Sequence, residues 1–219
     1  FRLLDHQGKK VTLTPAAKRL VDYLNFLAHE NQKMLDELKR QTAPLRLGAT
    51  LSIGSFLLPQ VLTEMIAQNR PVTTQIGNTQ TLLNQIQRGE LDAALVEGDF
   101  DHQRFDWEEI GLEPFALFGS QAIDRPVALP ELFDYPLLIR ESGSGTRQIL
   151  EKWLQAQGSA LTDFKQVIEI GSPATIITLL KDGVGISFMY RALVEDDLQS
   201  GKLFEWDLNK LSIRHALYL

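Results

Sequence analysis

Apolar residues recur at spacings of three and four along residues 14–41, which is typical of one long amphipathic helix. Thr14 and Pro15 favour its start, because threonine caps a helix and proline at the first helical position loses an amide that has no partner there. Thr42 and Pro44 end it, and no glycine or proline interrupts it. At about 1.5 Å per residue the helix is about 40 Å long. It is therefore too long to be buried against one small domain.

The apolar positions of this helix form a seam with the spacing of a coiled coil. Asn31 fills its one polar slot, and a neighbouring track carries Val21, Ala28 and Leu35 at intervals of seven. The seam consists of Ala17, Leu20, Leu24, Leu27, Asn31, Met34 and Leu38. We expect two copies of the chain to dimerise through this seam, with Asn31 helping to set the register. A long core helix is the alternative interpretation.

From residue 45 onward, short apolar runs alternate with helical segments. Residues 45–49, 72–76 and 91–96 have the composition of strands, and helices are expected between them. This alternation predicts a parallel sheet with helices on both faces. Ligands bind such sheets beyond the carboxyl ends of the strands. The first candidate binding residues are therefore Thr50, Ser52, Asn78, Thr79, Gln80 and Glu97.

A second α/β unit is expected from about residue 115. Its predicted strands are 136–140, 167–170 and 186–189, and its predicted helices are 148–157 and 174–181. Gly171 and Ser172 follow a strand and are further candidates for a pocket. Strands at 203–208 and 213–218 finish the chain, and the last is expected to return to the first unit.

Residues 141–147, Glu-Ser-Gly-Ser-Gly-Thr-Arg, join a predicted strand to a predicted helix. The glycines let a backbone approach a ligand closely, and the helix directs unpaired amides and the positive end of its dipole at that place. The planar fork of Arg147 could complete an anion site. Alternatively, the turn is a simple helix cap and Arg147 pairs with a nearby acid. The candidate ligand contacts are Ser142, Ser144, Gly145, Thr146 and Arg147.

Charge divides the chain into two parts. The 219 residues carry a net charge of -6, but residues 1–44 have a net charge of +3 and residues 45–219 a net charge of -9. A basic hairpin tip precedes the long helix, and its Lys9 and Lys10 could contact nucleic acid phosphates. A solvated surface turn is the other interpretation of these two lysines.

Composition excludes several classes of protein. The absence of cysteine excludes disulfides, thiolate metal sites and cysteine nucleophiles. No apolar run reaches the about 18 residues that span a bilayer, and the first residues do not resemble a signal peptide, so we expect a cytoplasmic location. No nucleotide P-loop is expected, because no Walker lysine follows residues 141–147.

Enzymatic chemistry is not expected either. The histidines His6, His29, His102 and His215 lie far apart without metal-ligand spacing, and no Ser, His and acid set is recognisable. We therefore expect no catalytic residue, no metal and no cofactor. Asp92 and Glu97 could be paired carboxylates, but we interpret Asp92 as a strand-edge residue that caps or pairs.

The front end resembles a known family. Phe1 and Arg2, followed by Val-Thr-Leu-Thr-Pro-Ala-Ala at 11–17, resemble the end of the winged helix-turn-helix domain of LysR-type transcriptional regulators, with Ala17 in place of the usual glycine. Residues 45–219 are similar to the effector-binding domain of that family. The residues that carry this second resemblance are 45–49, Leu58 and Pro59, 89–92, 141–147 and 183–186.

The resemblance implies an α/β fold in which a long N-terminal linker helix precedes a two-lobed domain like the type 2 periplasmic binding proteins. It implies a remnant of the wing at 1–13, a dimerising linker helix at 14–43 and an effector-binding domain at 44–219. Lobe I would span about 45–115 and 213–219, and lobe II about 116–212. We also expect that a helix-turn-helix before Phe1 and a closing helix after residue 219 belong to the longer protein.

The function implied is a DNA-binding transcriptional regulator that senses a small anionic effector between its lobes and changes its oligomer geometry. An inorganic oxyanion, a phosphorylated metabolite or a carboxylate is the expected effector class. The expected partners are DNA, bound weakly by these residues alone, and a second copy of the chain, with pairing of dimers into tetramers left open. A solute-binding receptor of a transport system is the alternative, although it predicts a signal peptide or lipid anchor and no coiled coil.

Overall fold

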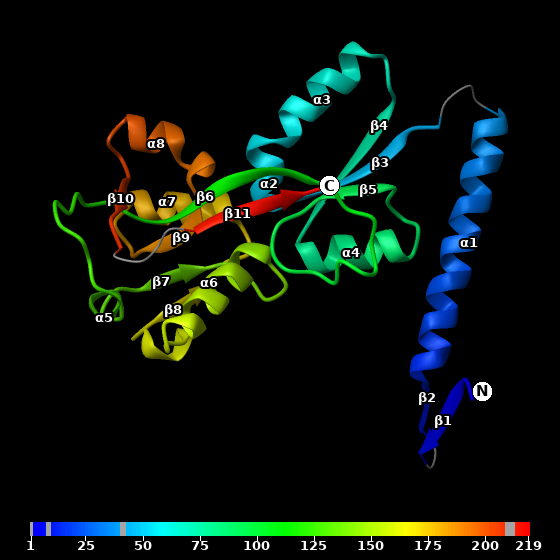
Figure 1. Ribbon diagram of the computed structural model, residues 1–219, viewed down its shortest axis with the longest axis horizontal. Helices are drawn as coiled ribbons and strands as arrows, with labels where there is room; N and C mark the ends of the chain where they lie inside the picture. Colours follow the sequence, from blue (N-terminus) through cyan, green and yellow to red (C-terminus); the bar gives the residue numbers. More distant parts are fainter. Residues whose placement is uncertain (1, 8–9, 40–42, 209–212) are drawn as a thin grey trace.

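The computed structural model, which describes residues 2–7, 10–39, 43–208 and 213–219, contains two α/β lobes with one long helix beside them (Figure 1). Lobe I is built on a parallel sheet with the strand order β4-β3-β5, as the alternation of strands and helices predicts. Its strands are β3 (Leu45–Thr50), β4 (Val72–Gly77) and β5 (Ala93–Leu95). Its helices are α2 (Leu51–Phe56), α3 (Leu58–Ala67) and α4 (Thr79–Gln87).

Side-chain caps close the strand-to-helix junctions of lobe I. The Thr50 hydroxyl accepts a hydrogen bond from the Ile53 amide at 3.3 Å, and the Asn78 side chain accepts one from the Thr81 amide at 2.9 Å. Such caps satisfy amides that the first turn of a helix leaves without partners. Since β3 and β4 are parallel, both caps lie at the same edge of the sheet.

Strands β6 (Glu109–Gly119) and β11 (Ile213–Tyr218) connect the two lobes (Figure 1). The first half of β6 pairs with β11, with Phe115 opposite Ile213. Its second half pairs with β9 (Ser187–Tyr190) and β10 (Phe204–Trp206). β6 is exposed where it begins and buried where it ends, because only its second half enters the core of lobe II.

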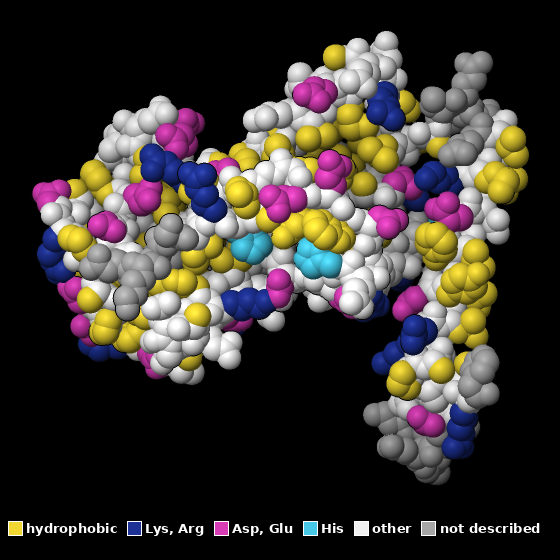
Figure 2. All heavy atoms as spheres, in the orientation of Figure 1, with side chains coloured by type: hydrophobic (Ala, Val, Ile, Leu, Met, Phe, Trp, Pro, Cys, Tyr) yellow, Lys and Arg dark blue, Asp and Glu magenta, His cyan; other side chains and the backbone are white. Residues whose placement is uncertain are grey.

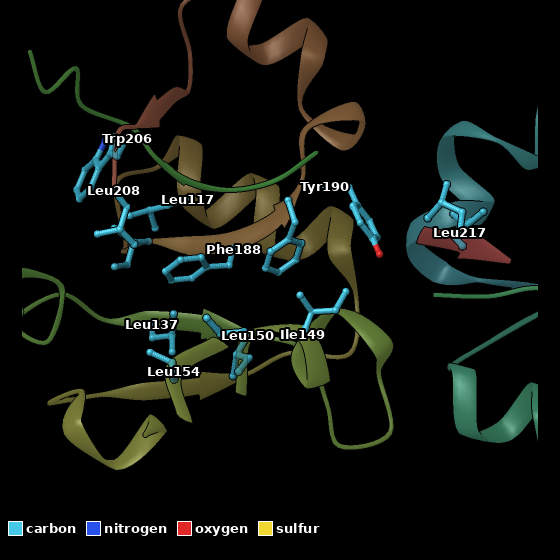
Figure 3. Packing of buried hydrophobic residues seen from close by; sticks show 14 of the residues in the cluster. Leu117, Leu137, Ile149, Leu150, Leu154, Phe188, Tyr190, Trp206, Leu208 and Leu217 are labelled. Atoms are coloured by element: carbon cyan, nitrogen blue, oxygen red, sulfur yellow. The ribbon is translucent and has the colours of Figure 1, made fainter. Parts of the chain in front are cut away.

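Lobe II completes its fold around the parallel pair β7 (Leu137–Ile139) and β8 (Val167–Glu169). Its helices are α5 (Leu129–Leu132), α6 (Gly145–Ala156), α7 (Pro173–Lys181) and α8 (Glu195–Gln199), with 3-10 turns at Leu161–Asp163 and Arg191–Leu193. One cluster of buried apolar side chains runs from Ile53 of lobe I through Phe115 to Leu150 and Phe188 of lobe II (Figure 3). Each such side chain contributes about 1.5–3 kcal/mol by its burial, so the lobes share a core.

Helix α1 (Pro15–Lys39) follows a hairpin of β1 (Leu4–Gln7) and β2 (Lys10–Leu13). The Thr14 hydroxyl accepts a hydrogen bond from the Ala17 amide at 3.1 Å and donates one to the Arg2 carbonyl at 2.8 Å, which joins the hairpin to the helix. Lys9 lies outside the described residues, and so does the side chain of Lys10. In the described part of the chain, no helix is long and apolar enough to cross a membrane.

Three boundaries differ from those that the sequence predicts. α6 begins at Gly145 instead of residue 148, because Ser144 is the extended residue that precedes the helix and the next three residues form its first turn. β6 begins at Glu109, well before the predicted 115. Asp5 pairs with Thr12 inside the hairpin, although the sequence places Asp5 at the turn.

Candidate functional site

Three candidate residues of lobe I meet at the end of β5. The Thr50 hydroxyl donates a hydrogen bond to the Glu97 carboxylate, and the Thr79 hydroxyl donates one to the Glu97 carbonyl oxygen at 2.9 Å. All three residues are buried. The carboxyl ends of β3, β4 and β5 therefore bring together the polar residues that the sequence selected there.

The environment of Glu97 changes its acidity. Its side chain belongs to a residue only 1% exposed, and this burial raises its pKa to about 7. The hydrogen bond from Thr50 and the charge of Arg140 oppose the shift, whereas the charge of Glu141 adds to it. Glu97 is therefore a carboxyl group that exchanges a proton near neutral pH.

Arg140 supplies a buried cation that the sequence analysis overlooked. It lies directly after β7 and is 6% exposed. Its Nε and Nη2 atoms donate to the two carboxylate oxygens of Glu141 at 2.8 and 2.9 Å, and its Nη1 donates to the Ser52 hydroxyl at 3.3 Å. The last hydrogen bond joins lobe II to lobe I. Its position after a buried strand was the available signal, because ligands gather at such strand ends.

Arg147, in contrast, pairs with acids of lobe II. Its Nε donates to Glu151 one helical turn later at 2.8 Å, and its Nη1 donates to Glu169 at 2.5 Å and to the Arg140 carbonyl at 3.3 Å. These contacts match the alternative that the sequence left open for Arg147. They arise because α6 begins at Gly145, which makes Arg147 the third residue of the helix.

The other candidates of lobe II fall into two groups. The buried Ser144 and Thr146 hydroxyls lie 2.9 Å apart at the start of α6, where Gly145 is also buried. Ser142 is exposed, and the Ser172 hydroxyl caps α7 by accepting from the Thr175 amide at 3.3 Å. Ser144, Gly145 and Thr146 thus face the same junction as Glu97, as the glycine contacts next confirm for Gly145.

Glycines bring the two lobes into direct contact. A Cβ atom on Gly145 would lie 2.3 Å from the Glu97 carbonyl oxygen, and one on Gly98 would lie 2.6 Å from the Cα of Gly145. Gly98 also has a φ of +90°, which favours glycine. Beside this contact the Gln148 side chain accepts from the Asp99 amide at 3.0 Å, and Lys152 pairs with Asp99.

On the opposite side of the junction, lobe I meets the loop that precedes α6. The Gln80 amide donates to the Gly143 carbonyl at 3.4 Å, and a Cβ on Gly143 would lie 3.4 Å from the Asn78 side chain. The structure therefore holds the lobes closed over the polar cluster, which we define as Thr50, Ser52, Thr79, Glu97, Arg140, Glu141, Ser144 and Thr146.

Tyr190 ends β9 and is the second residue that sequence reasoning missed. It is 0% exposed, and its hydroxyl has no hydrogen-bond partner among the described residues. Its ring packs edge-on against Phe56 and Phe115, and Figure 3 shows its hydroxyl pointing away from Phe188. Burial raises its pKa well above the usual range, and the charge of Glu97 raises it further. Tyr190 is thus a neutral donor close to the polar cluster.

Comparison with known families decides what this arrangement belongs to. The sequence model of the LysR substrate binding domain matches residues 39–219, which is most of the chain. This chain belongs to the LysR family. Its fold is the two-lobed one of the LysR regulatory domains, and its function is that of a LysR-type transcriptional regulator, as the sequence predicts.

Relatives of this LysR-type regulator include the HTH-type transcriptional regulator YeiE of Escherichia coli (strain K12), which is 29% identical over 213 residues, 93% of this chain and 70% of the relative. The RuBisCO operon transcriptional regulator of Acidithiobacillus ferrooxidans is 27% identical over 228 residues, 99% of this chain and 72% of the relative. Because these relatives regulate transcription, a transport receptor is not favoured.

Solved structures show the same fold. The regulatory domain of Synechocystis PCC6803 CcmR in complex with 2-PG has a TM-score of 0.70 and 20% identity, and the match covers 80% of this chain and 85% of that one. A full-length OxyR variant from Pseudomonas aeruginosa has a TM-score of 0.68 and 20% identity, over 99% of this chain and 77% of that one. The second match includes α1 as well as the lobes.

Helix α1 of this LysR-type regulator presents two different sides. On one side Lys33 donates to Asp92 at 3.1 Å, and Phe26 and His29 approach Gly89 of lobe I. On the other side lie the predicted seam residues, of which Leu24 is 54%, Met34 56% and Leu38 77% exposed. Leu27 and Asn31 are exposed and Leu20 is half-buried. Figure 2 shows hydrophobic side chains along the side of α1 that faces away from the lobes.

A cavity of about 780 Å³ separates part of α1 from lobe I. Phe26, Phe100, Trp107 and Tyr218 are among its lining residues, and none of the polar cluster reaches it. Its lining is mainly apolar, so it offers none of the hydroxyl and carboxyl groups found between the lobes. Within the described residues, no group of three or more His, Asp or Glu side chains could hold a metal ion.

Proposed function

We propose that this LysR-type regulator binds a small anion at the polar cluster between its lobes. The observation that carries the proposal is the junction itself, where hydroxyl groups of both lobes surround one buried arginine. Buried polar groups without an apolar reason for their position are typical of ligand sites. The proposed contacts are Thr50, Ser52, Asn78, Thr79, Glu97, Arg140, Ser142, Ser144, Gly145, Thr146, Ser172 and Tyr190.

Arg140, instead of Arg147, is the cation that we assign to the anion. The Nη1 atom of Arg140 has only the long hydrogen bond of 3.3 Å to Ser52, so an oxyanion between the lobes could take this donor. Arg147 directs its nitrogens at Glu151 and Glu169, which already neutralise it. Hydrogen bonds between guanidinium groups and oxyanions are roughly twice as strong as neutral ones.

The unpartnered hydroxyl of Tyr190 supports the same place. A buried donor without a partner costs about 1–3 kcal/mol, and a ligand oxygen that accepts its proton would recover that cost. Ser144 and Thr146, which hydrogen-bond only to each other through their side chains, offer further donors on the lobe II side. An anion there would contact both lobes at once.

Such a ligand would control the regulator by stabilising closed lobes over open ones. A ligand shifts a conformational equilibrium only as far as its affinities for the two states differ, and contacts to both lobes exist only in the closed state. Lobe I carries α1 with it, because Lys33 of α1 and Arg46 of β3 share the carboxylate of Asp92. Closure would therefore change how α1 is presented to a second copy.

We also propose that two copies pair through the α1 seam in the cytoplasm and that Lys9 and Lys10 contact DNA phosphates. Pairing of such dimers into tetramers stays an open proposal. The family to which the chain belongs, the exposed apolar side of α1 and its joint with lobe I support this assembly.

Titration calorimetry with matched arginine variants tests the anion site. The probes are bromide, sulfate, a small carboxylate and a phosphorylated carboxylate. The first two are chosen because titles of solved relatives, HypT of Salmonella typhimurium and OxyR2 of Vibrio vulnificus, name bromide and sulfate as bound. We expect Arg140→Gln to weaken binding at least about tenfold, because a charge-assisted hydrogen bond contributes about 1.5–3 kcal/mol.

The control is Arg147→Gln, which we expect to change the affinity less than about twofold. Thermal melting of both variants shows whether each remains folded. An affinity lost in Arg147→Gln and kept in Arg140→Gln would place Arg147 in the site instead. No binding of any probe would remove small anions as the effector class.

A further inference from the structure

We propose that the site between the lobes takes up its anion together with one proton, held at Glu97, so that anion binding weakens as pH rises. The inference rests on the proposed function, namely that the polar cluster binds a small anion. It adds a regulatory input, because the same effector concentration would occupy the regulator to different degrees at different pH.

The position of Glu97 carries the argument. Its carboxylate is buried and accepts a hydrogen bond from the Thr50 hydroxyl, while the Thr79 hydroxyl holds its carbonyl. Among the described residues no ion pair joins Glu97 to a cation. Arg140 is the cation whose charge acts on it, and Arg140 already pairs with Glu141 through two hydrogen bonds.

The charges around Glu97 come from three elements. Arg140 and Glu141 follow β7, and Tyr190 ends β9, where it also experiences the charge of Glu113 on β6. Thr50 at the end of β3 is uncharged, and the tyrosine stays neutral because burial raises its pKa. With Glu97 ionised, the Glu97, Arg140 and Glu141 group has a net charge of about -1, and with Glu97 protonated its net charge is about zero.

An added anion therefore meets a repulsive site in one protonation state and a neutral one in the other. Inside a protein, two like charges a few ångströms apart raise each other's cost strongly, and protonating one of them removes that cost. The protonated carboxyl group also gains a donor, which a ligand oxygen can accept. Anion and proton thus favour each other in this site, and by linkage each raises the affinity for the other.

The acidity of Glu97 sets the pH range. Its pKa of about 7 in the empty protein means that below this pH the proton is already in place, so the affinity should not change with pH there. Above it, each anion must bring a proton with it. The dissociation constant should then rise about tenfold per pH unit, until pH reaches the still higher pKa of Glu97 in the complex.

Sulfate is the probe for the test, because its own charge does not change between about pH 5 and about pH 9, whereas phosphate would titrate. Calorimetric titrations across this range give the slope of the dissociation constant. Repeating them in buffers with different heats of ionisation counts the protons taken up. We expect none at about pH 5 and close to one at about pH 8.

Two variants identify the group that takes up the proton. Glu97→Gln should bind sulfate with the same affinity at both ends of the range and take up no proton, because the amide does not titrate. Glu113→Gln is the matched control and should keep the slope, since Glu113 is the other glutamate whose pKa burial raises but lies outside the polar cluster. The proton count on the unmodified protein keeps the test valid if Glu97→Gln does not fold.

Each outcome bears on one of the two proposals. Sulfate binding by the unmodified protein without a pH slope, or a slope that persists in Glu97→Gln, would overturn proton uptake and leave the anion site standing. If neither sulfate nor any other anion of the panel binds at any pH, the proposed function fails, and the proton linkage fails with it.

Discussion

The outer side of α1 and the junction between the lobes are opposites in surface chemistry. α1 leaves large apolar side chains in contact with water, with Met34 56% exposed, whereas the junction buries Glu97 and Arg140 almost completely. Each arrangement is unfavourable by itself, because water avoids apolar groups and a protein interior avoids charges. Each is favourable only when something else is bound.

The contrast indicates what kind of partner each region awaits. An apolar stripe with a spacing of three and four fits another helix, which would remove it from water over its whole length. A small enclosed group of donors with one cation fits a ligand of a few atoms. A second copy and a small anion are therefore different requirements of one chain, and Asp92 lies at the joint between the two regions.

The largest expected effect would break the apolar side of the comparison. Leu24→Asp places a carboxylate in the proposed seam, and a dimer contains the position twice, so we expect the dissociation constant of the dimer to rise about a thousandfold. Analytical ultracentrifugation over a concentration series measures it. Asn25→Asp is the control, because the next residue is exposed on another side of the helix and receives the same charge. Equal weakening by both variants would exclude the seam as the interface.

A smaller effect is expected where the lobes touch. Gly145→Ala places a Cβ where only 2.3 Å separates it from the Glu97 carbonyl oxygen, so the lobes must part. We expect anion affinity to fall about a hundredfold, or about 2.7 kcal/mol, while the chain stays folded. Small-angle scattering should show a larger radius of gyration. Gly111→Ala, which has nothing within 4 Å of its new atom, is the control, and unchanged anion binding by Gly145→Ala would contradict the closed site.

The joint between the two regions should show the smallest of these effects. Asp92 accepts hydrogen bonds from the Arg46 amide and guanidinium and from Lys33, at 2.7 to 3.1 Å. We expect Asp92→Asn to lower the free energy of unfolding by about 2 kcal/mol, mostly through Arg46, because the Lys33 side chain is more exposed. Denaturant unfolding measures it. Glu90→Gln, which breaks the exposed pair with Arg88, should cost less than about 1 kcal/mol.

The pH dependence of the same variant gives the sign. Burial by itself raises the pKa of Asp92, but the hydrogen bonds from Arg46 and Lys33 outweigh it and hold that pKa well below the usual range. The stabilisation by Asp92 is thus fully present above its unfolded pKa of about 3.9 and is lost as pH falls further. Asp92→Asn should lose less stability than the unmodified protein between about pH 4 and about pH 2. Parallel loss in both proteins would show that Asp92 does not cause the acid dependence.

Local patterns were enough for the elements and the family. Apolar spacing and the Thr14 cap predict α1, and the alternation of strands with helices predicts the parallel sheet of β3, β4 and β5, because both depend on residues close in sequence. The resemblance of residues 45–219 to LysR effector domains predicts the two lobes. Strand ends also predict Thr50, Thr79 and Glu97 as neighbours, since parallel strands end at one edge.

Only the tertiary structure decided which arginine lies between the lobes and how acidic Glu97 is. Arg140 and Arg147 are seven residues apart, and the start of α6 at Gly145 turns Arg147 toward Glu169. Tyr190 belongs to an apolar run, so its sequence does not reveal that its hydroxyl lacks a partner. These properties depend on contacts and on the exclusion of water between segments far apart in the chain, and no local pattern encodes them.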